Sequence, residues 1–575
     1  MALQNDVAAI KSAKGQDSSA ETGFEYAVYP PSLSVAALSG DVYLNHSMTL
    51  FPDAQGKLEL LAGNNISVDN SAGQVITLNM SDADASFLPS VQKPTQQIEG
   101  SLNDGLIRTR ERLDASTPNP TLIHADLPVH LNGANQPIVQ AKFGSISFPS
   151  TSDVTFFLPQ AANFLAGKDI NNLSLSSQQL SESDATRLVA GRDINFDAII
   201  DENGAVQSND KQIEIGGVGE VQIQAGRNIN LGASSGINTI GNTKNSVLPS
   251  EGASISLIAG TIQPIESKVF STLFGVIENA AANAAAAPDS QRKTLYQKGY
   301  DAIDAVFSED HLHNSGDLSL VFSQIKTLSG GDINIAVPDG AVNVGLAGML
   351  GGIKKTAAQL GIVAQQSGDV NAITQGNFNV NQSRVFTMGG GDITIWSSKG
   401  DIDAGKGAKS SISAPAPITK IDSHGNAVTI FPPVVSGSGI QTITPQIENA
   451  RQGNVYLAAP TGIVDAGEAG ISGGKVVIAA NAVVGASNIS ATGGSVGVPT
   501  AVPAPSVPSG ASGAAASATK SATQMNDSSQ NQQVSDDKNG VGKKKAVMSF
   551  LSTDVIGFGN CSATDVRDKK EGCGG

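Results

Sequence analysis

A short turn motif recurs along the chain and constrains the fold more than any other feature. Its clear copies place Ala-Gly before Asp or Asn and Ile, and its degenerate copies keep Gly-Gly-Asp-Ile. Glycine tolerates positive φ, and Asp or Asn can bond its own backbone, so the motif predicts a tight turn followed by a short strand. One such unit, repeated every roughly 20–35 residues, cannot bury its apolar face alone, so neighbouring units must stack into a solenoid. The clear copies are residues 61–66, 165–170, 189–194 and 224–229, and the degenerate ones are 329–333 and 389–393.

The composition agrees with a β-solenoid better than with an ordinary enzyme. Glycine accounts for 63 of the 575 residues, whereas aromatic residues make up 4% and charged residues 15%. Such a chain is rich in turns and is filled by small aliphatic side chains. We therefore predict an all-β fold, a parallel β-helix with a small helical insertion and a disordered C-terminal tail. About 14 coils stacked at ~4.8 Å would span roughly 65–70 Å.

Charge and hydropathy exclude several classes of partner. The net charge of −16 argues against nucleic acid or an anionic membrane surface, because both require clustered basic side chains. The basic run at 543–545 lies in a low-complexity tail and is read as a solvated spacer. Glu278 and two asparagines interrupt the most apolar stretch, so no membrane span is expected. Residues 1–19 lack the features of a signal peptide, so we expect a fragment or truncated copy of a longer secreted protein.

Periodicity and composition divide the chain into six segments. Apolar residues follow helical spacing on both sides of Pro288, which predicts an αα-hairpin whose apolar stripes form core. Later, a stretch rich in Pro, Ala, Ser, Gln and Asn has too few apolar residues to order. The expected segments are an N-terminal entry segment (1–40), β-helix repeats (41–265), the helical hairpin (266–308), a second β-helix region (309–495), a disordered linker (496–545) and a C-terminal strand with a cysteine pair (546–575).

Two motifs resemble ligand sites but fit turns better. Residues 400–407 nearly match a phosphate-binding loop, yet Gly407 replaces the hydroxyl that would hold magnesium, and two aspartates would repel phosphate. The Gly-Gly-Asp phrases at 330–332 and 390–392 lack the tandem copies that calcium-binding repeats need. We therefore expect neither a nucleotide nor calcium at these positions.

A histidine pair also falls short of a metal site. His311 and His313 share one face of a predicted strand with a spacing that metals use, but no third histidine lies nearby in the sequence. A solvated loop is the better interpretation, and no cofactor is expected.

A polysaccharide lyase or hydrolase is the enzyme alternative, because a parallel β-helix can align carboxylates on one face. Asp392, Asp401 and Asp403 could lie on neighbouring coils near Trp396, the only tryptophan, which could stack on a sugar. Paired carboxylates are what glycosyl transfer requires. Each aspartate, however, follows Gly at a turn or alternates with Ile, which favours a structural role. We expect no catalytic residues and no enzyme activity.

Three long runs carry a family resemblance: 316–346, 454–490 and VNQSRVFTMGGGDITIWSSKGDIDAGKGAKSSISAPAP at 380–417. They resemble the conserved C-terminal region of filamentous haemagglutinin family exoproteins, adhesin-like proteins of Gram-negative bacteria exported by two-partner secretion. The resemblance implies a right-handed parallel β-helix, secreted or at the cell surface, whose full-length form passes an outer-membrane transporter. It also implies attachment to a host-cell or glycan receptor. The stalk of a toxin-delivery exoprotein is a further alternative.

The only two cysteines, Cys561 and Cys573, lie near the end of the sequence. An even pair in a chain otherwise without cysteine predicts a disulfide formed in an oxidising compartment. The closed loop could block passage through an outer-membrane pore and tether the protein at the surface. Alternatively, the pair is reduced or only staples a frayed end.

Overall fold

The computed structural model describes most of the chain between residues 28 and 499. These residues belong to the first of two units, Met1–Ala501, and the second unit, Val502–Gly575, lies outside the described residues. The described residues are 28–69, 73–85, 92, 127–131, 135–202, 206–207, 209–242, 247–263, 265–307, 315–346, 355, 359–406, 412–413, 418–421, 427–430, 435–444 and 451–499.

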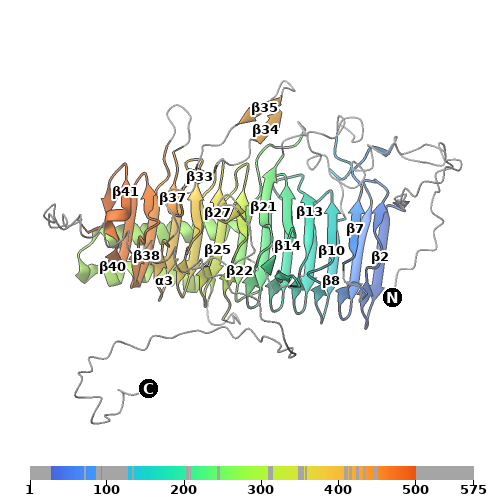
Figure 1. Ribbon diagram of the computed structural model, residues 1–575, viewed down its shortest axis with the longest axis horizontal. Coiled ribbons are helices and arrows are strands. Elements are labelled where there is room, and N and C mark those ends of the chain that lie inside the picture. Colours follow the sequence, from blue (N-terminus) through green and yellow to red (C-terminus); the bar gives the residue numbers. More distant parts are fainter. Residues whose placement is uncertain are drawn as a thin grey trace, which may run out of the picture. The chain divides into compact units, whose positions relative to one another are not determined.

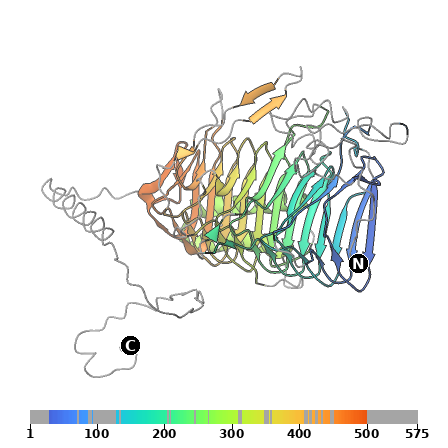
Figure 2. The same cartoon turned by 45° about the vertical axis from the view of Figure 1, so that its right-hand side comes forward.

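Two long parallel sheets build the described body as a stack of coils (Figures 1 and 2). The first sheet has 13 strands and receives one strand from each coil, a number close to the predicted one. Its strands are β1 (Val28–Tyr29), β4 (Met48–Leu50), β7 (Val75–Met80), β10 (Asp153–Leu158), β13 (Ser174–Gln178), β18 (Gln212–Gly216), β21 (Gly236–Gly241), β24 (Gln324–Thr327), β27 (Gly361–Ala364), β30 (Arg384–Thr387), β37 (Gly439–Thr442), β39 (Ile471–Gly473) and β41 (Ile489–Ala491).

The second sheet has 23 strands, because most coils add both a long and a short strand to it. The longer series is β2 (Ser32–Ala37), β5 (Lys57–Ala62), β8 (Ile138–Ala141), β11 (Asn163–Ala166), β14 (Ala185–Ala190), β19 (Glu220–Ala225), β22 (Ser254–Ala259), β25 (Ile333–Val337), β28 (Val370–Thr374), β31 (Ile393–Ser397), β38 (Val455–Asp465), β40 (Val476–Val484) and β42 (Ser495–Val496). The short series is β3 (Val42–Tyr43), β6 (Ile66–Ser67), β9 (Ile146–Ser147), β12 (Ile170–Asn171), β15 (Ile194–Asn195), β20 (Ile229–Asn230), β23 (Leu318–Ser319), β26 (Val342–Asn343), β29 (Phe378–Asn379) and β32 (Ile402–Asp403).

Strands of successive coils pair in parallel, which confirms the predicted parallel β-helix. Small excursions leave the coils as antiparallel pairs: β16 (Ile199–Ile200) with β17 (Val206–Gln207), β33 (Ile412–Ser413) with β36 (Val435–Ser436), and β34 (Ile418–Ile421) with β35 (Ala427–Ile430). A 3-10 turn, η6 (Ala486–Asn488), precedes β41.

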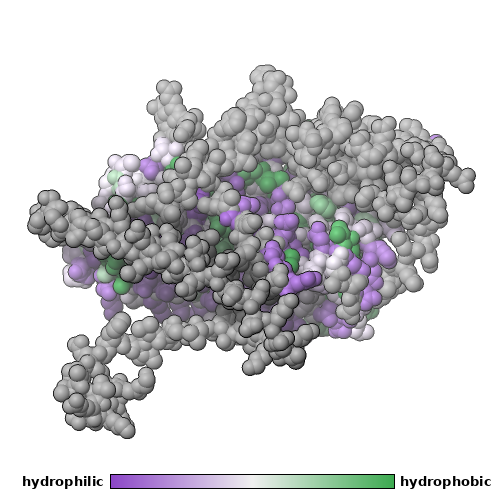
Figure 3. All heavy atoms as spheres, viewed as in Figure 1, coloured by the Kyte–Doolittle hydropathy of each residue, from purple (hydrophilic) through white to green (hydrophobic). Residues whose placement is uncertain are grey.

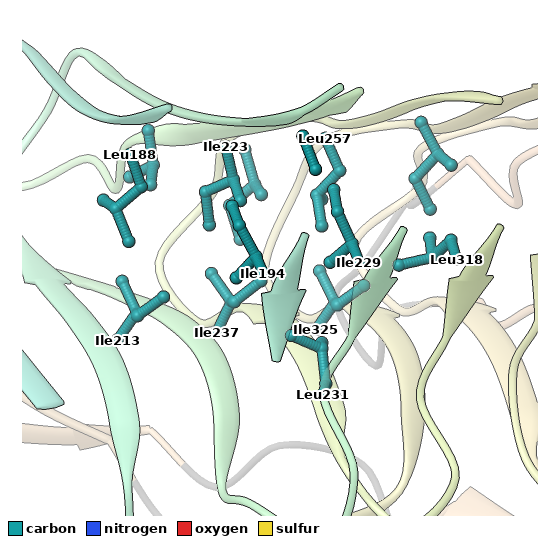
Figure 4. Close-up of a cluster of buried hydrophobic side chains, with 14 of the residues drawn as sticks. Leu188, Ile194, Ile213, Ile223, Ile229, Leu231, Ile237, Leu257, Leu318 and Ile325 are labelled. Atoms are coloured by element: carbon teal, nitrogen blue, oxygen red, sulfur yellow. The ribbon is translucent and has the colours of Figure 1, made fainter. Parts of the chain in front are cut away.

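The core is a set of inward-facing, mostly aliphatic side chains stacked from coil to coil (Figure 4). Leu188, Ile223 and Leu257 occupy the same register position on three consecutive long strands, and none is more than 1% exposed. Each such side chain contributes roughly 1.5–3 kcal/mol through burial. Side chains alternate inward and outward along a strand, so the neighbouring positions form the outer surface.

In the degenerate motif copies Gly330, Gly331 and Gly390 have the positive φ that the sequence predicts, but the glycines of the clear copies are needed for a different reason. None of the four described glycines in the clear motif copies has a positive φ. Instead, the preceding coil approaches the turn closely: a Cβ on Gly191 would lie 2.3 Å from the carbonyl oxygen of Gly167, and one on Gly226 would lie 2.3 Å from that of Gly191. Close stacking of turns, rather than backbone conformation, therefore demands glycine there.

A helical hairpin interrupts the seventh coil, as predicted. It comprises α2 (Ser267–Ala286) and α3 (Asp289–Val306), and Pro288 between them precedes the first turn of α3. The chain enters it after β22 and returns to the coil at β23. In the described part of the chain, neither helix is long and apolar enough to cross a membrane. The histidine pair at 311 and 313 lies outside the described residues, and so does the predicted C-terminal tail from residue 500 onward, with its cysteines. The first four residues of the predicted linker, 496–499, are described, and Val496 belongs to β42.

Candidate functional site

The outer face of the 23-stranded sheet changes character at the coil that carries the helical hairpin. One outward register position holds Gln224 on β19 and then Ile258 on β22. From Ile258 onward the row is apolar, and the helical hairpin packs on it. The row continues through Ala336, Ile373, Trp396, Ala458 and Ala479. A 20-residue helix spans ~30 Å, about the height of six stacked coils, so α2 can cover the coils that follow it.

Trp396 lies beneath the helical hairpin and is fully buried. The rings of Tyr296 and Tyr300 contact its indole edge-on, with centroids 6.1 and 5.5 Å away. Its Nε1 donates a hydrogen bond to Ser398 Oγ at 3.1 Å. The suggestion that Trp396 could stack on a sugar is therefore wrong, because two helical side chains already occupy its ring.

The three candidate catalytic carboxylates do not converge. They belong to one coil rather than to neighbouring coils, and Asp392 lies before β31 whereas Asp401 lies after it. Asp392 pairs with Arg451 Nη2 at 2.7 and 2.9 Å. Asp401 accepts the N–H of Ile463, and Asp403 accepts the N–H of Gly405, each at 2.8 Å. All three carboxylates thus stabilise turns or neighbouring coils.

Asp392 is instead the last member of a carboxylate stack formed by Asp332, Asp369 and Asp392 on consecutive coils. The N–H of Asp369 donates to Asp332 Oδ1 at 2.9 Å, and the N–H of Asp392 donates to Asp369 Oδ1 at 2.8 Å. The stack arises because each residue follows Gly and precedes the first residue of a long strand. Three Gly-Asp pairs in the sequence mark these positions, but their alignment into a stack depends on the register between coils and is not visible in the sequence.

Burial and neighbouring negative charges raise the pKa values of several groups at and near the carboxylate stack. Burial raises the pKa of Asp369 to about 6, although the hydrogen bond from the Asp392 N–H opposes the rise. Burial likewise raises the pKa of Glu278 on α2. Burial and the nearby charge of Glu278 raise the pKa of Tyr456 to about 12. Across the described ranges, no group of three or more His, Cys, Asp or Glu side chains is arranged to hold a metal ion.

A second series of acidic residues lies at the motif turns after the long strands. Asp193 Oδ1 accepts the N–H of Asn228 at 3.0 Å, and Asn228 Oδ1 accepts the N–H of Asp317 at 2.9 Å. Arg192 pairs with Asp169 and Arg227 pairs with Asp193. Each turn therefore holds the next one through side-chain to backbone bonds, which explains why Asp and Asn recur in the motif.

An open groove lies across the N-terminal coils, on the side of the short strands. Its volume is about 540 Å³. In the view of Figure 3, hydrophilic residues cover much of the described surface, with small apolar patches between them. The groove is lined by Tyr43, Asn65, Ser67, Val68, Asp69, Ser147, Phe148, Pro149 and Asp197. The sequence analysis did not identify these residues as a site.

The comparison with protein families concerns the last coils. Residues 390–500 match a family described as filamentous haemagglutinin family outer membrane protein. This range contains β31, β38 and β40, whose outer face the helical hairpin covers. No curated protein and no solved structure matches the chain. The match confirms, over residues 390–500, the resemblance to the filamentous haemagglutinin family that is predicted from the sequence.

Proposed function

We propose that the chain is a rod-shaped segment of a secreted or surface-displayed adhesin that attaches to cells or glycans without catalysis. The family match at residues 390–500, set within a parallel β-helix, carries this proposal. Stacked coils repeat the same outward positions along the body, so the protein can present an extended series of side chains to a partner. The receptor would be a host-cell component or an extracellular glycan.

An outer-membrane two-partner secretion transporter is the proposed export partner of the full-length protein. The family description refers to an outer membrane protein. Each coil pairs mainly with its neighbours, so a chain that emerges gradually could add one coil at a time. This mode of folding suits export of an extended chain.

The polysaccharide lyase or hydrolase is the weaker alternative. Its supporting constellation is not assembled, because Asp392, Asp401 and Asp403 stabilise turns and Trp396 is buried. A toxin-delivery stalk would need a toxin domain after the β-helix, and no described residue supplies one. Attachment remains the function that the described surface supports best.

An attachment assay with an enzymatic counter-assay tests the proposal. Beads coated with the purified full chain are expected to bind cells saturably, whereas beads coated with the heat-denatured chain are not. The same preparation is incubated with bacterial and host polysaccharides while reducing ends and unsaturated products are measured. Turnover that Asp401→Ala abolishes would establish the enzyme alternative instead.

We also propose that Cys561 and Cys573, which lie outside the described residues, form a disulfide. Alkylation before and after reduction, followed by mass spectrometry, distinguishes the bonded pair from thiols. Replacement of both cysteines by Ser in the full-length exported protein tests the tethering role. More protein in the medium and less on the cell supports a block in the pore, whereas an unchanged partition supports a local staple only.

A further inference from the structure

The groove across the N-terminal coils arises from a change of side-chain size along one stacked row. Tyr43 on β3 pairs in register with Ser67 on β6, and the next coil places Ser147 beside it. The following coil carries Asn171 at the same position. Two small side chains between larger ones leave a hollow whose wall at one end is the half-buried Tyr43 ring.

Hydrogen bonds hold the polar groups of the groove in place. Asp197 Oδ2 accepts a bond from Asn172 Nδ2 at 2.8 Å, which holds that carboxylate, whereas the backbone N–H of Asp69 donates to Asn45 Oδ1 at 3.0 Å and holds the main chain there. The hydroxyl of Tyr43 donates to Asp41 Oδ2 at 3.2 Å, which restrains the ring. A site whose side chains are already oriented loses less entropy when a ligand binds.

The charged side chains that line the groove are all negative. Asp69 and Asp197 line it and are exposed, whereas its lining contains no Lys or Arg. The charge of Asp41, with a smaller contribution from Asp69, raises the pKa of Tyr43, so a negative potential reaches the ring. A sulfated, sialylated or phosphorylated ligand would be repelled by this potential.

Combining an aromatic wall, carboxylates, an amide and serine hydroxyls, the groove matches a ligand rich in hydroxyl groups. A volume of about 540 Å³ lies within the roughly 300–1,000 Å³ typical of ligand sites. Aromatic rings pack on the apolar faces of ligands, and carboxylate oxygens accept bonds from hydroxyl or ammonium groups.

We propose that this groove binds a neutral or amino-bearing stretch of glycan, with Tyr43 stacking on a sugar face while Asp69 and Asp197 accept bonds from its hydroxyl or amino groups. The assignment deepens the proposed adhesin function and rests on it. It places receptor recognition on the N-terminal coils, outside the family-matched residues 390–500.

The experiment uses the full chain on an array of neutral, amino-bearing, sialylated and sulfated glycans. Ser67→Leu fills the groove, and Tyr43→Ala removes its wall. Ser319→Leu makes the same substitution in the same row, on β23, away from the groove, and serves as the matched control. Circular dichroism and thermal unfolding confirm that each variant keeps the fold.

We expect binding to neutral or amino-bearing glycans that weakens about tenfold or more in both groove variants and not in Ser319→Leu. Preference for sulfated or sialylated glycans overturns the proposal. The proposal is also overturned if glycan binding survives Ser67→Leu, if the chain binds a lysine-rich peptide but no glycan, or if it binds nothing on the array.

Bead attachment separates this proposal from the broader one. If the wild-type chain and Ser67→Leu attach to cells equally, the groove assignment fails while the adhesin function stands. If the wild-type chain attaches to no cell and binds no glycan, both fail.

Discussion

Gly299 of α3 lies directly against the indole of Trp396 on β31. A Cβ added at Gly299 would be 2.5 Å from Cη2 of that ring, closer than real Cβ contacts. The next residue, Tyr300, donates its hydroxyl proton to the Ser398 carbonyl at 2.7 Å. The helical hairpin, inserted before the family-matched region, is thus fitted to that region at the level of single side chains.

Substitution of Gly299 should loosen this fit. Gly299→Ala forces the helix away from a buried ring, so we expect the free energy of unfolding to fall by about 1–3 kcal/mol. Trp396 is the only tryptophan in the chain, so its fluorescence reports the contact directly. We expect a red-shifted emission and a lower midpoint in urea.

Gly275 on α2 offers the matched control. A Cβ there would meet nothing within 4 Å. Gly275→Ala should stabilise the protein slightly, by up to about 1 kcal/mol, through helix propensity alone. Equal effects of the two substitutions would show that the contact with Trp396 does not matter.

Some of this architecture was predictable because it depends on short-range patterns. The spacing of the motif turns predicts stacked parallel coils, and helical spacing around Pro288 predicts the helical hairpin. The face that the hairpin covers was not predictable, because Ile258 and Trp396 align only through the register of successive coils. The groove was missed for the same reason: Ser147 is brought beside Ser67 by stacking across a long insertion.

The carboxylate stack predicts an unusual dependence of stability on pH. Burial raises the pKa of Asp369 from 3.8 to about 6 in the folded state. Between these values the folded state binds a proton that the unfolded state releases, so this residue stabilises the fold as the pH falls from about 6 toward 4. This stabilising contribution is lost above pH 6. The pKa shift limits the loss to about 3 kcal/mol, and solvent screening makes it smaller because Asp369 is partly exposed.

Asp369→Asn tests this prediction, since the amide keeps an acceptor for the Asp392 N–H. The variant should be more stable than the wild type at pH 7.5 and should lose that advantage near pH 4. Urea unfolding across this range measures the difference. Asp401→Asn, which lies after β31 and outside the carboxylate stack, controls for the general loss of one negative charge. A constant gap between wild type and Asp369→Asn would contradict the assignment.

Val321 adopts a left-handed backbone conformation that a β-branched residue disfavours. Its φ is 54°, and asparagines at 172 and 381 take φ values of 55° and 58° at turns that likewise follow short strands. Because the left-handed region costs ordinary residues roughly 1–2 kcal/mol and asparagine less, Val321→Asn should stabilise the protein by about 1 kcal/mol. Chemical denaturation measures the gain.

The reverse substitution completes that test. Asn381→Val should destabilise by more than the first substitution stabilises, because Asn381 Nδ2 also donates to the Gly345 carbonyl at 2.7 Å. Destabilisation by Val321→Asn would show that packing of the valine outweighs its backbone strain.

The final prediction concerns the bonds that join successive motif turns. Asp193 accepts both the N–H and Nδ2 of Asn228, at 3.0 and 3.1 Å, and pairs with Arg227. Asp193→Ala leaves the Asn228 N–H without this acceptor, so we expect a loss of about 1–2 kcal/mol and faster hydrogen exchange at that amide. Asp193→Asn keeps an acceptor and gives up only a partly exposed ion pair worth about 0–1 kcal/mol, so it should preserve slow exchange. If both variants exchange equally fast, the ion pair rather than the side-chain to backbone bond joins the turns. The recurrence of Asp and Asn in the motif would then need a different explanation.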